Sequence, residues 1–295
     1  MSTIHWYPGH MTKARRMIVS QLELIDVVIE LLDARIPYSS RNPDIDALAG
    51  QKKRVLVLNK SDLADPNINR QWEKYFKAQE LNVVCLNLKN NDKNKSGLAK
   101  LELLIKDSMK AIAARQKQRG RQNLPIRAMI LGIPNSGKST LINQLSGFSG
   151  TKTSDRPGVT RGRQWIKTSI GFDLLDTPGI LWPKFEDSIG EYLAITGAIS
   201  DNVFDPILLA QRLIEILSVI SPIAIQKRYK VSTDSSSEKT LEAISLARGH
   251  KVKGNDLDIN RTAIMLIDEF RAGKTGKISL EKPNDPLHST KDMLN

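Results

Sequence analysis

The chain has 295 residues, and its 44 lysines and arginines against 32 aspartates and glutamates give a formal net charge of +12. This length favours two compact units, and the charge favours a polyanionic partner, either nucleic acid or an anionic membrane surface. Because Cys85 is the only cysteine, the chain can form neither an internal disulfide bond nor a cysteine-based zinc site. We expect a cytoplasmic protein outside the membrane, because no apolar run approaches the roughly 18 residues that span a bilayer and no apolar signal core opens the sequence.

The first half of the chain alternates helical and strand patterns. Apolar residues at 11–25 recur at spacings of three and four, which predicts an amphipathic helix. Residues 71–80 and 97–119 predict two further helices that cross between strands. Short β-branched runs predict buried parallel strands at residues 27–32, 55–58, 83–88 and 126–133. This alternation predicts an α/β domain that binds its ligand at the carboxyl ends of its strands.

The remainder of the chain begins with two predicted strands, at 164–169 and 172–176, and is helical after residue 183 apart from a polar loop at 232–239. We therefore expect an α/β domain at 1–183, a helical domain at 184–282 and a loose tail at 283–295.

Helix starts are predicted by capping residues. Asp205 precedes Pro206 and Ser221 precedes Pro222, which predicts an N-cap followed by proline at the first helical position in both places. Asp258 is predicted to cap the last helix.

The strongest motif spans residues 132–140, GIPNSGKST, which matches the phosphate-binding pattern G-x-x-x-x-G-K-[ST]. It lies directly between a predicted strand and a predicted helix, where backbone N–H groups can cradle phosphate oxygens. Lys138 is predicted to reach the β- and γ-phosphates, and the Ser139 hydroxyl to bind Mg²⁺.

A second motif, Asn59-Lys60-Ser61-Asp62, ends the predicted strand at 55–58. The Asp62 carboxylate can accept hydrogen bonds from N1–H and the 2-amino group of guanine, whereas adenine offers an acceptor at N1 and has no 2-amino group. Together with the phosphate-binding pattern, this motif predicts GTP rather than ATP as the ligand.

A third motif, Asp176-Thr-Pro-Gly179, ends another predicted strand. Asp176 is predicted to hold Mg²⁺ through water, and the Gly179 amide to meet the γ-phosphate. Thr160, in an Arg/Pro/Gly loop upstream, is predicted to complete the Mg²⁺ shell when γ-phosphate is present.

The motifs are those of a Ras-like GTPase in a changed order, because Lys60 precedes Lys138 by 78 residues. A circular permutation explains this order. The sequence resembles the ribosome biogenesis GTPase A family from residue 4 to about residue 283. The resemblance rests on this permuted order and on residues 6–11 (WYPGHM), 32–37 (LDARIP) and 268–274 (DEFRAGK).

That resemblance implies a circularly permuted Ras-like P-loop GTPase fold, with a parallel-type sheet flanked by helices and a smaller all-helical C-terminal domain. It implies a bacterial cytoplasmic enzyme that hydrolyses GTP and matures the large ribosomal subunit. The site residues that it implies for guanine and its flanks are Asn59, Lys60, Ser61, Asp62, Leu86 and Asn87. Those that it implies for the phosphates are Asn135, Ser136, Gly137, Lys138, Ser139 and Thr140.

Asn135 resembles the asparagine through which related GTPases bind K⁺, and the alternative is a turn-forming role. Ile180 stands where Ras-type enzymes carry a water-orienting glutamine, and its side chain cannot hydrogen-bond, so slow intrinsic hydrolysis is expected. The resemblance points to His10 as the catalytic candidate, beside Lys138 and Thr160. We expect His10 to dock only on the ribosomal precursor; packing of a turn is its alternative role.

Positive charge gathers at 106–127, 152–167 and 227–253, with local net charges of +6, +4 and +4. Several such runs favour phosphate contacts to a structured RNA, and with the resemblance they predict rRNA of the large-subunit precursor as partner.

DNA is not expected as a partner, and the free chain is expected to be a monomer. Two alternatives stay open, a GTP-gated RNA-binding factor whose hydrolysis is incidental and a permuted GTPase of another RNA particle. Since the segment after Gly179 leads directly into the helical domain, nucleotide-dependent affinity for the particle is predicted.

Overall fold

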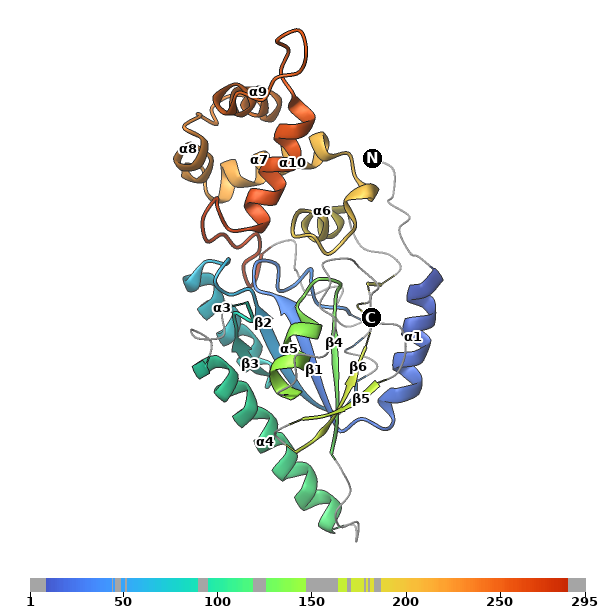
Figure 1. Ribbon diagram of the computed structural model, residues 1–295. Coiled ribbons are helices and arrows are strands. Elements are labelled where there is room, and N and C mark those ends of the chain that lie inside the picture. Colours follow the sequence, from blue (N-terminus) through green and yellow to red (C-terminus); the bar gives the residue numbers. More distant parts are fainter. Residues whose placement is uncertain are drawn as a thin grey trace.

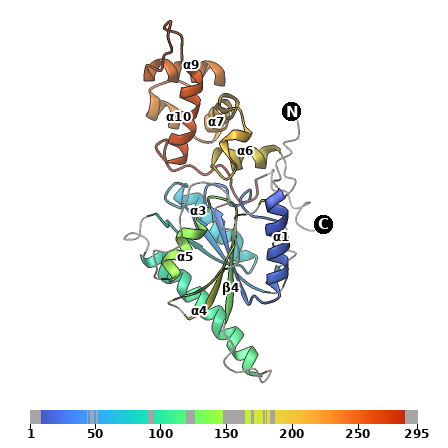
Figure 2. The same ribbon diagram turned by 45° about the vertical axis from the view of Figure 1, so that its right-hand side comes forward.

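The computed structural model describes residues 9–43, 45, 49–50, 52–89, 95–118, 126–146, 164–168, 171–177, 179, 181–182 and 187–285. These residues form a sheet flanked by helices, with a bundle of helices standing over one end of the sheet (Figure 1). The same stacking is visible after a 45° turn (Figure 2).

The sheet has six strands in the order β3-β2-β1-β4-β6-β5. All neighbouring strands are parallel except β5 and β6, which are antiparallel. The strands are β1 (Val27–Asp33), β2 (Lys53–Asn59), β3 (Asn82–Cys85), β4 (Arg127–Gly132), β5 (Gln164–Lys167) and β6 (Asp173–Asp176). Each predicted strand exists, although β3 ends three residues earlier than the apolar run at 83–88 had indicated.

The centre of the sheet is the pair β1 and β4. From β1 the chain continues to β2 and β3 on one side, whereas from β4 it continues to β5 and β6 on the other. Ligands of open α/β sheets bind at the carboxyl ends of strands at such a reversal of strand order. The phosphate-binding loop (residues 132–140) follows β4, and the NKSD segment (residues 59–62) follows β2, the other neighbour of β1.

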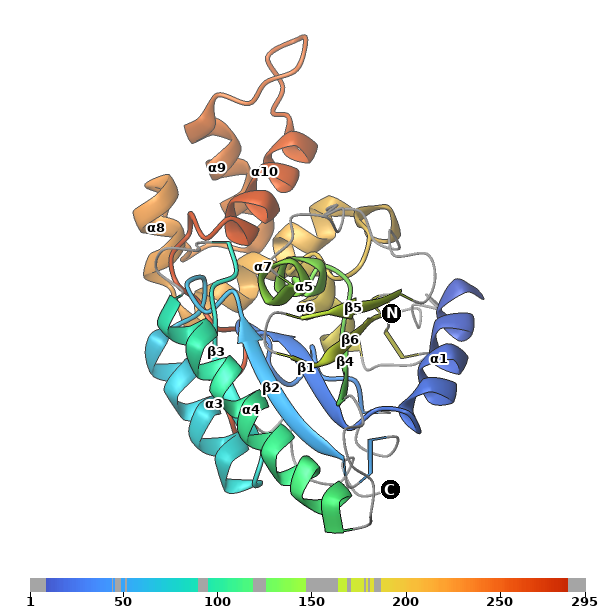
Figure 3. The same ribbon diagram turned by 60° about the horizontal axis from the view of Figure 1, so that its bottom comes forward.

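Helices cover both faces of the sheet, which explains why the strands are apolar almost throughout. Residues Val27, Ile29 and Leu31 of β1 pack in the cluster that contains side chains of α4 (Lys95–Gln118) and α5 (Lys138–Ser146). The alternate residues of β1 face α1 (Gly9–Leu22) and α3 (Pro66–Ala78). Viewed from below, α3 and α4 lie near β3, and α1 lies near β5 and β6 (Figure 3).

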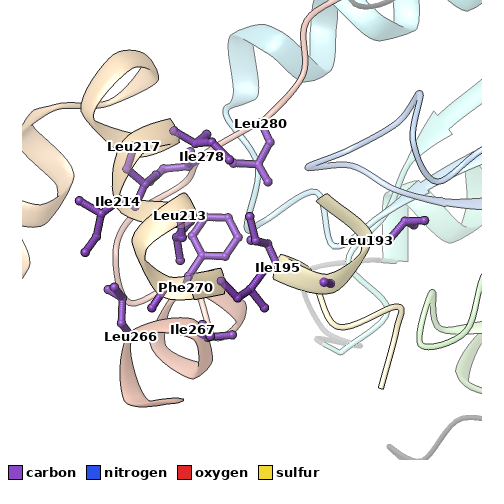
Figure 4. Packing of buried hydrophobic residues seen from close by; sticks show 14 of the residues in the cluster. Leu193, Ile195, Leu213, Ile214, Leu217, Leu266, Ile267, Phe270, Ile278 and Leu280 are labelled. Atoms are coloured by element: carbon purple, nitrogen blue, oxygen red, sulfur yellow. The ribbon is translucent and has the colours of Figure 1, made fainter. Parts of the chain in front are cut away.

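The helical bundle comprises α6 (Asp187–Ile195), a 3₁₀ turn (Asp201–Val203), α7 (Pro206–Ile220), α8 (Ile223–Tyr229), α9 (Ser237–Arg248) and α10 (Ile259–Arg271). In its core, Phe270 of α10 lies beside Leu213 of α7 and Ile195 of α6 (Figure 4). The same cluster includes Ile36 and Ile133, which follow β1 and β4. The bundle and the carboxyl end of the sheet therefore share one apolar core.

Two of the predicted helix caps are confirmed. Asp205 accepts hydrogen bonds from the amides of Ile207 and Leu208 at the start of α7, and Asp258 accepts one from Arg261 at the start of α10. Both aspartates thus satisfy amides that the first helical turn leaves unpaired.

Ser221 is not an N-cap, so that prediction is wrong. It is the C-cap of α7, and α8 begins after Pro222, which has no side chain that can accept a hydrogen bond. The predicted loop at 232–239 is too long, because Ser236 caps Lys239 and α9 begins at Ser237. Similarly, α3 begins at Pro66 instead of residue 71, because Asp65 caps its first turn.

Within the described residues, no single helix is both long and apolar enough to cross a membrane. In the described part of the chain, one pair of helices, α7 and α8, reaches that length and composition when taken together, and the two meet at a bend of 117°.

The chain returns to the sheet after α10. The amide of Ile278 donates to the carbonyl of Leu63 (2.9 Å), and the amide of Leu280 donates to that of Arg35 (2.8 Å). The carbonyl of Glu281 accepts from the indole N–H of Trp72 (3.3 Å). The division at residue 183 stays a prediction, but residues 278–281 of the expected helical domain pack on the sheet.

Candidate nucleotide-binding site

The phosphate-binding loop has a backbone that requires glycine. Gly137 has φ +102°, and a Cβ atom there would overlap the side-chain amide of Asn59. Asn135 also adopts a positive φ, of +57°, which asparagine tolerates better than most residues. Lys138, Ser139 and Thr140 form the first turn of α5, directly after the loop.

Lys138 is buried within this loop. Its ammonium donates hydrogen bonds to the carbonyls of Gly132 (3.1 Å) and Ile133 (2.8 Å). Burial lowers the pKa of Lys138 to about 8, although the charge of Asp176 opposes this shift. The lysine is therefore close to neutralisation at mild pH, and phosphate oxygens would favour its charged form.

Asn59 joins the NKSD segment to the phosphate-binding loop. Its side-chain nitrogen donates to the carbonyl of Ser136 (2.7 Å), and its side-chain oxygen accepts from the amide of Leu88 (3.1 Å). The amide of Ser61 donates to the carbonyl of Leu86 (3.0 Å). Three segments that are far apart in the sequence thus form one wall of the site.

The other predicted guanine-site residues differ in exposure. Asp62 is exposed, so its carboxylate is open to a ligand, whereas Leu86 is buried. The side chain of Asn87 accepts a hydrogen bond from the amide of Lys89 (3.1 Å). Leu86 therefore contributes backbone contacts to this wall.

Lys60 has φ +58° and directs its ammonium to the buried carboxylate of Asp33 (2.9 Å). Arg35 binds both oxygens of the same carboxylate, at 2.9 and 2.7 Å. Burial alone would raise the pKa of Asp33, but the charges of Arg35 and Lys60 outweigh it and hold that pKa well below its usual range. Burial also lowers the pKa of Lys60, against the opposing charge of Asp33.

Sequence reasoning assigned no role to Asp33 or Arg35, although both lie in the LDARIP stretch used for the resemblance. Their partners, Lys60 after β2 and Thr196 in the helical bundle, are distant in sequence, so local patterns could not reveal them. The available signal was that one charged residue, Asp33, ends the apolar run of β1 and another, Arg35, comes two residues later.

Asp176 and Gly179 approach the phosphate-binding loop from β6. Asp176 is the last residue of that strand and is buried. A Cβ atom on Gly179 would lie 2.8 Å from Pro134 Cα and 2.9 Å from the ammonium of Lys138. Only glycine fits this close approach.

The structure therefore brings Asn59, Ser136, Gly137, Lys138, Asp176 and Gly179 together. Thr160 and Ile180 lie outside the described residues. His10 lies in the first turn of α1, and its side chain is outside the described part. The individual roles of these residues toward a nucleotide stay predictions.

Asn135 links the phosphate-binding loop to the helical bundle. Its side-chain nitrogen donates to the carbonyl of Gly197 (2.8 Å), which follows α6 in the helical bundle. The loop is therefore tied directly to the bundle.

Comparisons with known proteins agree with this geometry. A family described as "50S ribosome-binding GTPase" matches residues 127–241. Ribosome biogenesis GTPase A of Bacillus cereus is 42% identical over 98% of this chain and 97% of its own length, and that of Bacillus pumilus is 41% identical over 95% and 99%. The solved GNP-bound YlqF from T. maritima is 28% identical, with a TM-score of 0.64 over 92% of this chain and 99% of that one.

These relatives match nearly the whole chain and nearly all of their own length. These matches confirm the predicted P-loop GTPase fold. They also support the predicted binding of guanine nucleotides. The chain belongs to the ribosome biogenesis GTPase A family, and it is a GTP hydrolase of ribosome biogenesis.

Proposed function

We propose that this GTPase binds the precursor of the large ribosomal subunit through rRNA, and that GTP binding and hydrolysis control a late step of its assembly. The name of the matching family, 50S ribosome-binding GTPase, supports the choice of subunit. The chain acts in the cytoplasm, as a monomer when free, on RNA and not on DNA.

The observation that carries this proposal is a cationic cluster in the helical bundle. Three basic side chains lie within 4 Å of one carboxylate, that of Glu269 on α10. They are Arg228 (2.5 Å) in the last turn of α8, Arg248 (3.7 Å) at the end of α9, and Lys274 (3.8 Å) in the segment after α10. One carboxylate cannot balance three cations, so this surface keeps a positive charge that suits phosphate groups.

Four exposed lysines lie close to these arginines in the sequence. Lys227 is on α8, Lys230 is the C-cap of α8, and Lys251 and Lys253 are on the connection between α9 and α10. The described strands and bundle contain no predicted RNA-base motif of interleaved aromatic residues, so recognition by RNA shape and backbone is proposed.

Co-sedimentation with purified large-subunit precursors tests the proposal. We expect tighter binding with a GTP analogue than with GDP, and weaker binding at higher salt. Replacing Lys227, Lys230 and Lys251 by glutamate should weaken binding by about tenfold or more. Each substitution removes a phosphate contact and, with it, the release of counterions that favours binding. The control is glutamate at Lys74 and Lys77, which are exposed on α3. The proposal would be contradicted if the bundle variant bound the precursor as tightly as the control variant does. It would also be contradicted if the wild type bound equally well with the GTP analogue and with GDP.

For the nucleotide itself, we propose that Asn59, Lys60, Ser61 and Asp62 read guanine while residues 135–140 and Gly179 hold the phosphates. Ser139, Thr160 and Asp176 would hold Mg²⁺, which would supply positive charge to offset that of the phosphates. Hydroxyl and carboxylate oxygens are the ligands that Mg²⁺ prefers, which supports this set. In the same proposal, Asn135 binds K⁺.

His10 remains the proposed catalytic residue, supplied when α1 and the segment before it engage the particle. The test is GTP turnover of His10→Ala with and without large-subunit particles. Loss of particle stimulation supports this role, and equal stimulation of both proteins rejects it.

A further inference from the structure

The carboxyl end of α6 is held by side chains from three other parts of the molecule. Arg271 of α10 donates to the carbonyls of Ala194 (2.8 Å) and Ile195 (3.2 Å). Arg35 donates to the carbonyl of Thr196 (3.3 Å), and Asn135 donates to that of Gly197 (2.8 Å). The last carbonyls of a helix lack partners within it and carry partial negative charge, so arginine and amide donors stabilise this end.

Arg35 connects this helix end to the guanine side of the nucleotide site. The two oxygens of Asp33 bind the guanidinium of Arg35, and one of them also accepts from the ammonium of Lys60. Arg35 and Asp33 are buried, and the Arg35 guanidinium lies 5.7 Å from the centre of the Phe270 ring on α10. A shift of Lys60 therefore changes the ion pairs of the arginine that holds Thr196.

Asn135 connects the same helix end to the phosphate side. It lies in the loop whose carbonyls, at Gly132 and Ile133, now bind the ammonium of Lys138. Phosphate oxygens would compete with these carbonyls for the ammonium. Nucleotide binding would therefore change the hydrogen bonds of the loop that holds Gly197, and it can shift this contact if the contact differs between the free and the bound protein.

We propose that Arg35 and Asn135 are positioning residues that transmit nucleotide occupancy to the helical bundle through the carbonyls of Thr196 and Gly197. The guanine side acts through Lys60, Asp33 and Arg35. The phosphate side acts through Asn135, and Arg271 passes both on to α10. Coupling between two sites is reciprocal, so the seating of α6 sets nucleotide affinity by the same factor. The coupling rests on the nucleotide site of the proposed function, but it concerns the free chain with its nucleotide and needs no ribosomal particle.

Hydrogen exchange of the full chain, with and without GDP, tests the coupling. The amides of Thr196 and Ala198 donate to the carbonyls of Tyr192 and Leu193, so their exchange reports opening of the α6 end. In the wild type, we expect GDP to change exchange at residues 196–198 by about fivefold or more, the lower range of typical coupling. No change there, with GDP bound at saturation, would overturn the proposal.

Arg35→Lys tests the guanine side. Lysine keeps the positive charge but lacks the fork that spans Asp33 and Thr196 at once. We expect weaker GDP binding and, at saturating GDP, a reduced response of residues 196–198, while exchange in the phosphate-binding loop still responds. A single-turnover hydrolysis rate close to that of the wild type would distinguish positioning from a direct role at the phosphates.

Asn135→Ala tests the phosphate side and replaces a more accessible side chain, so it keeps the proposal testable if Arg35→Lys does not fold. It should also reduce the response at residues 196–198. The matched control is Arg212→Lys, because Arg212 contacts α6 through Glu191 (2.8 Å) and not through its carboxyl end. The control should keep the full response. A full response in both Arg35→Lys and Asn135→Ala would overturn the proposal.

Discussion

The side-chain amide of Asn59 donates a 2.7 Å hydrogen bond to the backbone carbonyl of Ser136. Asn59 opens the NKSD segment and Ser136 lies in the phosphate-binding loop, so this bond joins the guanine and phosphate halves of the site. The two motifs stand in permuted order along the chain, but the sheet brings β2 and β4 to either side of β1. The site therefore depends on spatial and not sequential order.

Asn59→Ala should weaken GDP binding by about tenfold or more. The substitution leaves the carbonyl of Ser136 and the amide of Leu88 without their partner, and each such loss costs roughly 1–3 kcal/mol when the group is buried. Titration with a fluorescent GDP derivative measures the effect. Asn82→Ala, at an exposed position of β3, is the control and should bind as the wild type does. Unchanged affinity of Asn59→Ala would show that the bond does not shape the site.

GDP affinity should decrease as the pH rises through about 8. Burial lowers the pKa of Lys138 to about 8 in the free chain, whereas phosphate charges favour its ammonium in the complex. Above that pH the complex binds more protons than the free protein, so binding weakens as protons become scarce. Between about pH 7 and about pH 8.5, a range that limits ionisation of guanine itself, we expect roughly a fourfold loss of affinity. Calorimetric titration checks this, and a flat profile would contradict it.

Glu281 should make the protein less stable as the pH rises from about 4.5 to about 7. Its carboxylate accepts hydrogen bonds from the amides of Tyr38 (2.8 Å) and Ser39 and from the Ser39 hydroxyl. Burial nevertheless raises its pKa to about 7, against those hydrogen bonds. Between these pH values the folded state binds more protons than the unfolded state. The contribution of Glu281 to the free energy of unfolding is therefore fully present below about pH 4.5, and it is lost as the pH rises to about 7, by on the order of 3 kcal/mol in total.

Thermal denaturation between pH 5 and pH 7.5 measures this effect through Glu281→Gln, which cannot ionise. The melting temperature of this variant should depend less on pH than that of the wild type. Glu238→Gln, exposed on α9, should keep the slope of the wild type. The same slope in all three proteins would contradict the role of Glu281.

Glu269→Gln should destabilise the helical bundle. Glu269 accepts hydrogen bonds from Arg228 (2.9 and 2.5 Å) and from the hydroxyl of Tyr229 (2.9 Å). The hydrogen bonds of Arg228 hold the pKa of Glu269 at about 2, so its contribution is present above pH 4.5 and is lost as the pH falls toward 2. At neutral pH we expect a loss of roughly 1–3 kcal/mol in denaturant unfolding. The difference between variant and wild type should shrink in acid, and a constant difference would contradict this account.

Local patterns predicted the strands, most helices and the phosphate-binding loop, because periodicity, caps and glycine spacing act over a few residues. They failed at Ser221, where a polar residue before proline ends one helix instead of starting the next. They could not reveal that Arg35 reaches Thr196 or that Asn135 reaches Gly197, since these partners are distant in sequence. The return of residues 278–281 to the sheet was equally hidden, because it follows from packing across the whole chain.

The most direct test of the proposed function is GTP turnover of the purified chain, alone and with large-subunit or small-subunit precursors. A slow intrinsic rate that large-subunit precursors accelerate by at least about tenfold is predicted, since the particle completes the catalytic site. Small-subunit precursors should have no such effect. A rate that neither particle changes, or that both accelerate equally, would contradict the assignment to the large subunit.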